Sequence, residues 1–449
     1  MSASRIPPTN LADLLERHLM GQKDFAGAEL QGVELNNVNL EGVNLSGANL
    51  LGARLQGANL RRAKLQGARL IGADLSRANL EEARLDGALL GGARLLGANL
   101  RRAVLTKANL AGSDLSHAIL SSADLFRADL RMANLESTVL IRASLEKANL
   151  EDACLKATDL RSVNGRRANL RRASFESVNA VNANLTGAFL DQARLDSSNL
   201  AKAVLQGASL AKASLVRVNL AEADLDGAIL EWALVKDSNL DGATLRGARA
   251  GVAQFQNTTL EGAHLEDAEL NWVKLRGARL KAAYLSRADL RGAKLPEADL
   301  TKADLTYARL QGAVLDRAIL NGADLRGAVL DDASLTGANL QEACFDDARV
   351  VRANLVGAQL RGSSFLRANL KAAVLKETSL AYANLLEAKL EDANLQHSDL
   401  SKAIGLTREM LEEALTDDDT IEPADLNFIS RALAQMRFRR WSSVSSSSD

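Results

Sequence analysis

Apolar residues recur at every fifth position of this chain from Phe25 to Leu400, and no insertion or deletion disturbs the spacing. All but ten of the 76 positions in this series, which we call centres, are Leu. The residue two positions before each centre is Ala, Val, Ser or Thr, with Lys23 as the single exception. Asn, Asp, Arg, Glu and Gly gather at the other three positions. Each pentapeptide therefore has two apolar positions and three polar ones.

Neither a long helix nor a straight strand can bury this pattern. At about 100° per residue, a step of five turns each centre by roughly 140° from the last, which scatters the leucines around a helix. In a straight strand the odd step places successive centres on opposite sides. A chain that turns a corner every five residues avoids both problems, because each centre and its small partner then share one inward face.

The charged residues indicate how many pentapeptides complete one coil. Arg61, Glu81 and Arg101 lie four pentapeptides apart and alternate in sign, and the same interval separates Asp347 from Arg367. The same spacing relates the pairs Glu146/Arg166, Glu151/Arg171 and Asp152/Arg172. Stacked coils lie about 4.8 Å apart, close enough for opposite charges to attract. We therefore expect four-sided coils, each of four pentapeptides, about 19 of them forming a rod of about 90 Å.

Runs such as ANLRRAKLQGARLIGADLSRANL, at residues 58–80, resemble the A-[D/N]-L-X-X consensus of the pentapeptide-repeat proteins. The resemblance covers residues 23–402. It implies an all-β solenoid, a right-handed quadrilateral β-helix with the central Leu and the small Ala stacked inside. The best-understood branch of that family resembles B-form DNA and binds type II topoisomerases.

Some centres depart from Leu and predict local repacking. Gly165 and Phe175 lie on opposite faces of one coil, so the phenyl ring can fill space beside the glycine. Phe345 and Phe365 share a face in adjacent coils and should stack. Volume-conserving repair of the core is the main interpretation, and a kink or a ligand cavity is the alternative.

A solenoid exposes its apolar core at both ends, so we expect caps. Residues 1–22 should form an N-terminal cap, with a helix over residues 10–20, Asn10 as its N-cap and Gly21 as its stop. Its apolar face would be formed by Leu11, Leu14, Leu15 and Leu19.

Residues 403–441 should form a C-terminal helical cap or oligomerisation segment, followed by a disordered tail over 442–449. Residues 405–415 predict a short helix started by Thr407, and a second, amphipathic helix begins at Pro423. The apolar residues of that second helix are Leu426, Ile429, Leu433 and Met436. It could fold back over the last coil, mediate a homodimer, or touch a membrane surface.

Little in the sequence points to chemistry. The four histidines are widely separated, and Cys154 and Cys344, both at outward positions, form no metal-binding spacing. No phosphate-binding loop or catalytic motif is present. We therefore expect no enzymatic activity, no cofactor and no metal.

The overall charge of −1 makes nucleic acid an unlikely partner. The densest basic group is Arg161, Arg166, Arg167, Arg171 and Arg172. One coil earlier stand Glu146, Glu151 and Asp152, which should neutralise this group. No apolar run is long enough to span a bilayer, and the start lacks a secretory signal, so we expect a cytoplasmic protein without a membrane partner.

One apolar surface feature predicts a protein-binding site. Trp232, Val252 and Trp272, which we call the aromatic column, share one outward position on three successive coils. Ile229 and Leu234 flank Trp232. Exposed tryptophans are typical of interaction hot spots. The alternatives are chance placement and coverage of the column by the chain's own C-terminal helix.

The leading hypothesis is a non-enzymatic scaffold for protein–protein interaction. One alternative is a DNA-mimicking binder of type II topoisomerase (gyrase) of the quinolone-resistance type. That role needs a continuous acidic face, which arginine and lysine interrupt here. A further alternative is an accessory or cargo protein of a bacterial secretion system.

Overall fold

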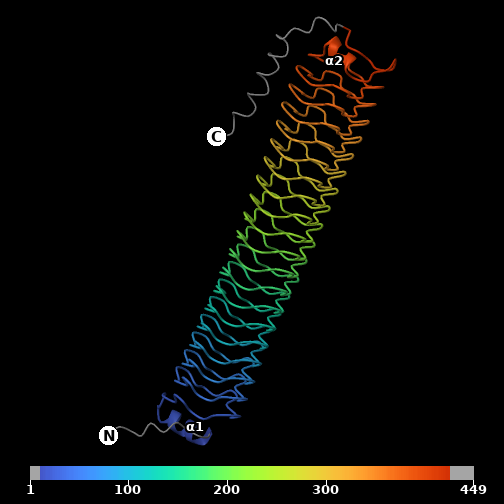
Figure 1. The fold of residues 1–449 in the computed structure, drawn as a ribbon. Coiled ribbons are helices and arrows are strands. Elements are labelled where there is room, and N and C mark those ends of the chain that lie inside the picture. Colours follow the sequence, from blue (N-terminus) through green and yellow to red (C-terminus); the bar gives the residue numbers. More distant parts are fainter. Residues whose placement is uncertain (1–10, 425–449) are drawn as a thin grey trace. The chain divides into compact units, whose positions relative to one another are not determined.

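The computed structural model describes residues 11–424, which divide after Ile229 into two compact units. In each unit the chain turns through successive coils stacked on one another (Figure 1). Helix α1 (Leu11–Leu19) opens the first unit and helix α2 (Arg408–Glu412) lies near the end of the second. No other helix is formed within residues 11–424.

Parallel pairing joins each face of a coil to the same face of the next. Asp24 pairs with Asn44 in the first unit, and Leu234 pairs with Gln254 in the second, both across four pentapeptides. The same interval holds along both units as far as Ile404, which confirms the four-sided coil. Each face contributes a single paired residue, the one before the centre, so the described faces hold no longer strand.

The backbone hydrogen bonds of one face show why the coils stack. The N–H of Phe25 donates to the carbonyl of Asn44 in the next coil, and the N–H of Asn44 donates to the carbonyl of Lys23, each at 2.7 Å. Main-chain polar groups are thereby satisfied between coils, as burial requires.

A tight turn forms each corner. The N–H of Ala48 donates to the carbonyl of Leu45 at 3.0 Å, and Gly47 between them has φ +64°. A positive φ at the third residue of a turn is typical of type II. The Oδ1 atom of Asn44 accepts the N–H of Ser46 at 3.1 Å. This explains why Asn or Asp precedes the centre and why Gly is frequent two residues after it.

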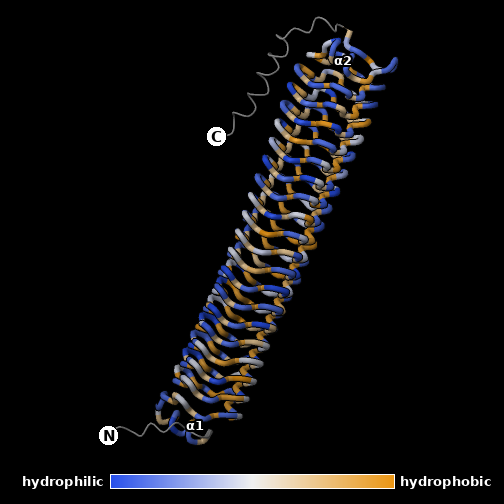
Figure 2. Tube along the Cα trace, in the orientation of Figure 1, coloured by the Kyte–Doolittle hydropathy of each residue, from blue (hydrophilic) through white to orange (hydrophobic). Residues whose placement is uncertain are grey.

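Leu centres and their small partners fill the interior of both units. Hydropathy accordingly alternates along every coil (Figure 2). The predicted stack of Phe345 on Phe365 is confirmed, with ring centroids 4.7 Å apart and planes at 10°. At Gly165 an added Cβ would lie 2.8 Å from Cδ2 of Leu185. The prediction that Phe175 fills the space beside this glycine is therefore wrong, because Leu185, on the same face of the next coil, occupies it.

Helix α1 covers residues within the predicted range and is followed by a turn at Gly21, where φ is +88°. Leu14 is fully buried, but Leu19 is 86% exposed. The prediction that Leu19 belongs to the buried face is therefore wrong, because the helix ends at this residue and the chain turns there into the first coil. The predicted N-cap, Asn10, lies outside the described residues.

Helix α2 begins as predicted, because the side chain of Thr407 accepts the N–H of Met410 at 3.3 Å. The helix is shorter than predicted, and the chain beyond it returns to the coil: Leu415 pairs with Asn394 and Ile421 with Asp399. Pro423 and Ala424, at the predicted start of the second helix, are not helical. The rest of that helix, with Leu426, Ile429, Leu433 and Met436, and the tail lie outside the described residues.

Candidate protein-binding surface

The aromatic column lies at one corner of successive coils in the second unit. The N–H of Trp232 donates to Gly251 at 3.3 Å, and the N–H of Val252 donates to Asn271 at 3.0 Å. Each residue of the column therefore lies beside its counterpart in the next coil. The structure thus brings Trp232, Val252 and Trp272 together, as the period of four pentapeptides predicts.

All three residues occupy the left-handed position of their turn, with φ of 61°, 63° and 60° for Trp232, Val252 and Trp272. Side chains other than Gly, Asn and Asp rarely adopt this conformation, and for a β-branched residue it is strained. Val252 is the single β-branched residue with a positive φ within residues 11–424. Many other non-glycine residues hold the same φ at corners of both units, so the strain peculiar to the column is that of Val252.

The two indoles are the exposed part of the column, at 60% for Trp232 and 61% for Trp272. The indole of Trp272 lies over Gly292 of the next coil, where an added Cβ would come within 2.5 Å of Cε3. Because Gly292 has no side chain, the indole can pack directly against its backbone. This contact was not predicted from the sequence. An aromatic residue at a corner, followed four pentapeptides later by Gly, is a pattern that would have predicted it.

The two flanking residues of the predicted site, Leu234 and Ile229, belong to different units. Leu234 is half-buried and lies on the face that follows the Trp232 corner. Ile229 is half-buried and pairs with Ser209 in the first unit. Because Ile229 belongs to the other unit, its grouping with the column stays a prediction.

Ion pairs border the column. The guanidinium of Arg249 pairs with Glu231, and its Nε lies 3.6 Å from a carboxylate oxygen of Glu269. Arg291 pairs with Asp289 at 2.5 Å. An apolar centre with a charged rim is the usual anatomy of a protein interface.

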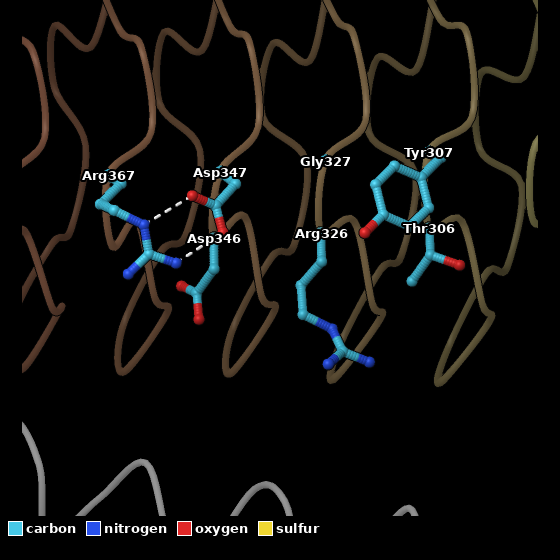
Figure 3. A pocket seen from close by; sticks show the side chains of 7 residues that line it. All are labelled: Thr306, Tyr307, Arg326, Gly327, Asp346, Asp347 and Arg367. Carbon is cyan, nitrogen blue, oxygen red and sulfur yellow. Dashed lines mark hydrogen bonds and ion pairs between the residues drawn. The ribbon is translucent and has the colours of Figure 1, made fainter.

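A shallow pocket of about 340 Å³ lies at a different corner of the second unit (Figure 3). It is lined by Thr306, Tyr307, Arg326, Gly327, Asp346, Asp347 and Arg367. Tyr307 is 66% exposed and lies over Gly327, repeating the arrangement of Trp272 on Gly292. Arg367 donates to Asp347 at 2.6 Å, and this hydrogen bond lowers the pKa of Asp347. The carboxylate is thus occupied by an ion pair.

The cysteines offer no reactive site. Cys344 lies at the outward position of its coil, as expected, in the ladder between Asp324 and Ser364, but it is only 4% exposed. Burial raises the pKa of the Cys344 thiol to about 12. Cys154 is half-buried, and both thiols are free. Within the described part of the chain, no group of His, Cys, Asp and Glu is arranged to hold a metal.

Ion pairs between coils confirm much of the predicted charge ladder. Arg61 lies 3.1 Å from Glu41 and 3.8 Å from Glu81. Arg172 pairs with Asp152 at 2.8 Å and with Glu151 at 2.6 Å, and these hydrogen bonds raise its pKa.

Two predicted pairs are wrong. Arg171 pairs with Asp191 at 3.2 Å rather than with Glu151. Arg166 forms no ion pair among the residues the structure describes, while Glu146 accepts a hydrogen bond from Asn164 at 3.4 Å. The basic group is therefore neutralised only in part.

No described helix has the length and apolar character needed to cross a bilayer. A comparison with curated proteins finds no match. Among solved structures, the chain is similar to QnrB1, a plasmid-mediated fluoroquinolone resistance protein, at 20% identity over 46% of this chain and 95% of that one, with a TM-score of 0.24. It is also similar to HetL from the cyanobacterium Nostoc sp. strain PCC 7120, at 27% identity over 74% and 98%, with a TM-score of 0.12.

The family model described as "Pentapeptide repeats (8 copies)" matches residues 24–121, 123–249, 253–350 and 353–404 in overlapping segments. These segments cover most of the chain and the same pentapeptides whose corners and ladders form the two units. Membership of this family also carries the right-handed quadrilateral β-helix as the fold. The chain belongs to the pentapeptide-repeat family.

Proposed function

We propose that this protein is a non-enzymatic scaffold that binds another protein through the aromatic column. The observation that carries the proposal is the pairing of exposure with strain. Two indoles are more than half exposed, and Val252 between them holds a left-handed φ of 63°. Every corner imposes this φ, so what distinguishes the column is that two aromatic residues and one β-branched residue stand there in successive coils.

Packing of the core does not require the side chains of the aromatic column. The centres and their small partners already fill the interior, and the column lies outside it. A partner that covers the two indoles would gain roughly 2 kcal/mol or more from each if they act as hot spots. The ion pairs of Arg249 and Arg291 at the border suit a polar rim.

The proposal extends to the rest of the chain. We propose about 19 coils in all, with α1 and α2 as parts of the caps and the segment beyond residue 424 as a route to a homodimer. We also propose a cytoplasmic protein that needs no cofactor and binds neither nucleic acid bases nor membranes.

Charge distinguishes this scaffold from a DNA-mimicking binder of gyrase. Mimicry of DNA needs a continuous negative field. Here arginines meet the carboxylates at the corners of both units, as in Arg61 with Glu81 and Arg367 with Asp347. An accessory role in bacterial secretion would be one use of such a scaffold.

The test replaces both indoles, Trp232→Ser and Trp272→Ser, in the full-length chain. Partners captured by the wild-type protein from its native cell are identified by mass spectrometry, and their binding to purified variants is then measured. We expect weaker binding with nearly unchanged thermal stability. Lost stability with retained binding would instead mean that the column packs against the protein's own chain.

A second pair of variants tests the contact between the Trp272 indole and Gly292. Gly292→Ala puts a Cβ into the indole of Trp272, whereas Gly312→Ala, at the same corner one coil on, meets nothing within 4 Å. The two glycines have nearly equal φ, +64° and +65°, so both changes introduce the same backbone strain. Only Gly292→Ala should weaken partner binding beyond its effect on stability.

A further inference from the structure

Four positively charged residues follow one another at a single corner of the first unit, one in each of four successive coils. The basic column consists of Lys107, Arg127, Lys147 and Arg167. Each stands two residues after a centre, one coil from the next, with φ between 56° and 58°. All four side chains are exposed. Gly87 and Gly187 occupy the same corner position before and after the run.

At other corners, charged residues that stand two positions after a centre in adjacent coils have opposite signs. Arg62 pairs with Glu82 at 2.6 Å, and Arg352 pairs with Asp332 at 2.7 Å, each between adjacent coils. No residue of the basic column forms an ion pair among the described residues. Like charges on neighbouring strands destabilise a sheet, so the run carries a cost that the rest of the fold avoids.

Nearby carboxylates are directed elsewhere. Asp129 pairs with Arg131 at 2.6 Å. Asp124 accepts the N–H of Phe126 at 3.0 Å and the hydroxyl of Thr106 at 3.2 Å. Glu146, next to Lys147 in the chain, accepts a hydrogen bond from Asn164 at 3.4 Å and is in no ion pair with the column among the described residues.

Three contacts position three of the four basic side chains, those of Arg127, Lys147 and Arg167. The guanidinium of Arg127 and the ammonium of Lys147 lie 5.1 Å and 5.7 Å from the ring centroid of Phe126, within cation–π range. An added Cβ at Gly187 would lie 3.6 Å from Cγ of Arg167, so the stem of that arginine lies along the next coil. The four residues therefore line up in the backbone, and three of their side chains contact neighbouring residues.

We propose that the basic column binds the acidic stripe of an α-helix from a partner protein. At the coil spacing, the Cα atoms of the four residues lie at about 0, 4.8, 9.6 and 14.4 Å along the corner. Carboxylates at helix positions i, i+3, i+7 and i+10 lie at about 0, 4.5, 10.5 and 15 Å along one face. The two series agree to within about 1 Å, which flexible side chains accommodate.

The straight line of charge disfavours duplex DNA as the ligand. The phosphates of each strand follow a helical path around the duplex, and its charges recur about every 1.7 Å of axis. Carboxylates on one helix face remain in line. This surface is separate from the aromatic column, and its test does not depend on that site.

The probe is a synthetic helical peptide of about 18 residues with Glu at i, i+3, i+7 and i+10. Its control has the same composition with Glu at every fifth position, which scatters the charges around the helix. Binding to the full-length protein is measured by fluorescence anisotropy at about 20 mM and about 200 mM salt, because screening weakens exposed charge pairs. A thymidine oligonucleotide is tested in parallel.

The decisive variant is Lys107→Glu with Lys147→Glu, which turns the run into the alternating ladder that the fold uses elsewhere. Its melting temperature should be equal or higher, while peptide binding falls by about tenfold or more. The matched control, Arg77→Glu with Arg142→Glu, makes the same change in net charge at two other exposed corners. It should change peptide binding by less than about twofold.

The proposal is overturned if the scattered peptide binds as tightly as the striped one, or if the control variant weakens binding equally. It is also overturned if the oligonucleotide binds more tightly than the striped peptide, which would make the site one for phosphate. If the reversal variant melts lower than wild type, Lys107→Ser with Lys147→Ser replaces it. Undiminished peptide binding by that variant would refute the proposal.

Discussion

Replacing Val252 with Asn should make the protein more stable. Val252 is a β-branched residue held at φ 63°, and Asn adopts this region far more readily. The chain already places Asn at equivalent corners, as at Asn182 with φ 58° and Asn257 with φ 55°. The substitution therefore keeps the turn and removes the steric conflict.

Two opposing effects set the size of the gain. Relief of the left-handed strain is worth about 1–3 kcal/mol. Val252 is half-buried, so losing its apolar side chain costs about half of full burial, or about 1 kcal/mol. The expected net gain is about 1 kcal/mol. Ala282→Asn, at φ 53° and without a β-branch, should change stability by less than about 0.5 kcal/mol.

Urea unfolding monitored by tryptophan fluorescence measures the change in stability of the coils around the aromatic column. The sequence has three tryptophans, so Trp441→Phe leaves only the two of the aromatic column as reporters. Local reporting matters because repeat arrays need not unfold in one step. A Val252→Asn variant that unfolds at lower urea than its parent, or a gain no larger than that of Ala282→Asn, would show that no strain is stored at this corner.

Four further outcomes are expected. Leu310→Lys should unfold several coils, seen as lost circular dichroism signal, because it buries an unpaired charge in a core that neighbouring coils share. Glu81→Arg should destabilise by about 1 kcal/mol by aligning three arginines, and added salt should reduce the effect. Cys154 should react with iodoacetamide at pH 8 well before Cys344, since burial and a pKa of about 12 protect the latter thiol. The purified protein should not inhibit gyrase supercoiling at sub-micromolar concentration, and potent inhibition would favour DNA mimicry.

The period and the inward positions could be predicted because the same constraint is written at every repeat. Any single Leu is ambiguous between helix and strand, but a fixed step of five excludes both. The interval of opposite charges then identified four sides, and the pairing of Asp24 with Asn44 confirms it. The stacking of Phe345 on Phe365 followed from the same arithmetic.

Partner choice at the surface could not be predicted in the same way. A long arginine side chain can reach the coil before or after its own, so Arg171 meets Asp191 rather than Glu151. Cys154 and Cys344 share one place in the repeat, yet the first is half-buried and the second buried, so that place alone does not predict exposure. The left-handed conformation of the corners could have been predicted, because glycine recurs two residues after the centre. That prediction would have identified Val252 as a strained residue.

The two lengths in this fold, one pentapeptide for a face and four for a coil, imply different tolerances to changes in chain length. Deleting one pentapeptide between Val252 and Trp272 would leave an apolar residue at every centre, and the interior would remain filled. Everything downstream would nevertheless move by a quarter turn, which places Trp272 on the neighbouring corner. Gains and losses that preserve a binding surface must therefore come in whole coils, and duplication of whole coils is the route by which such a surface can lengthen.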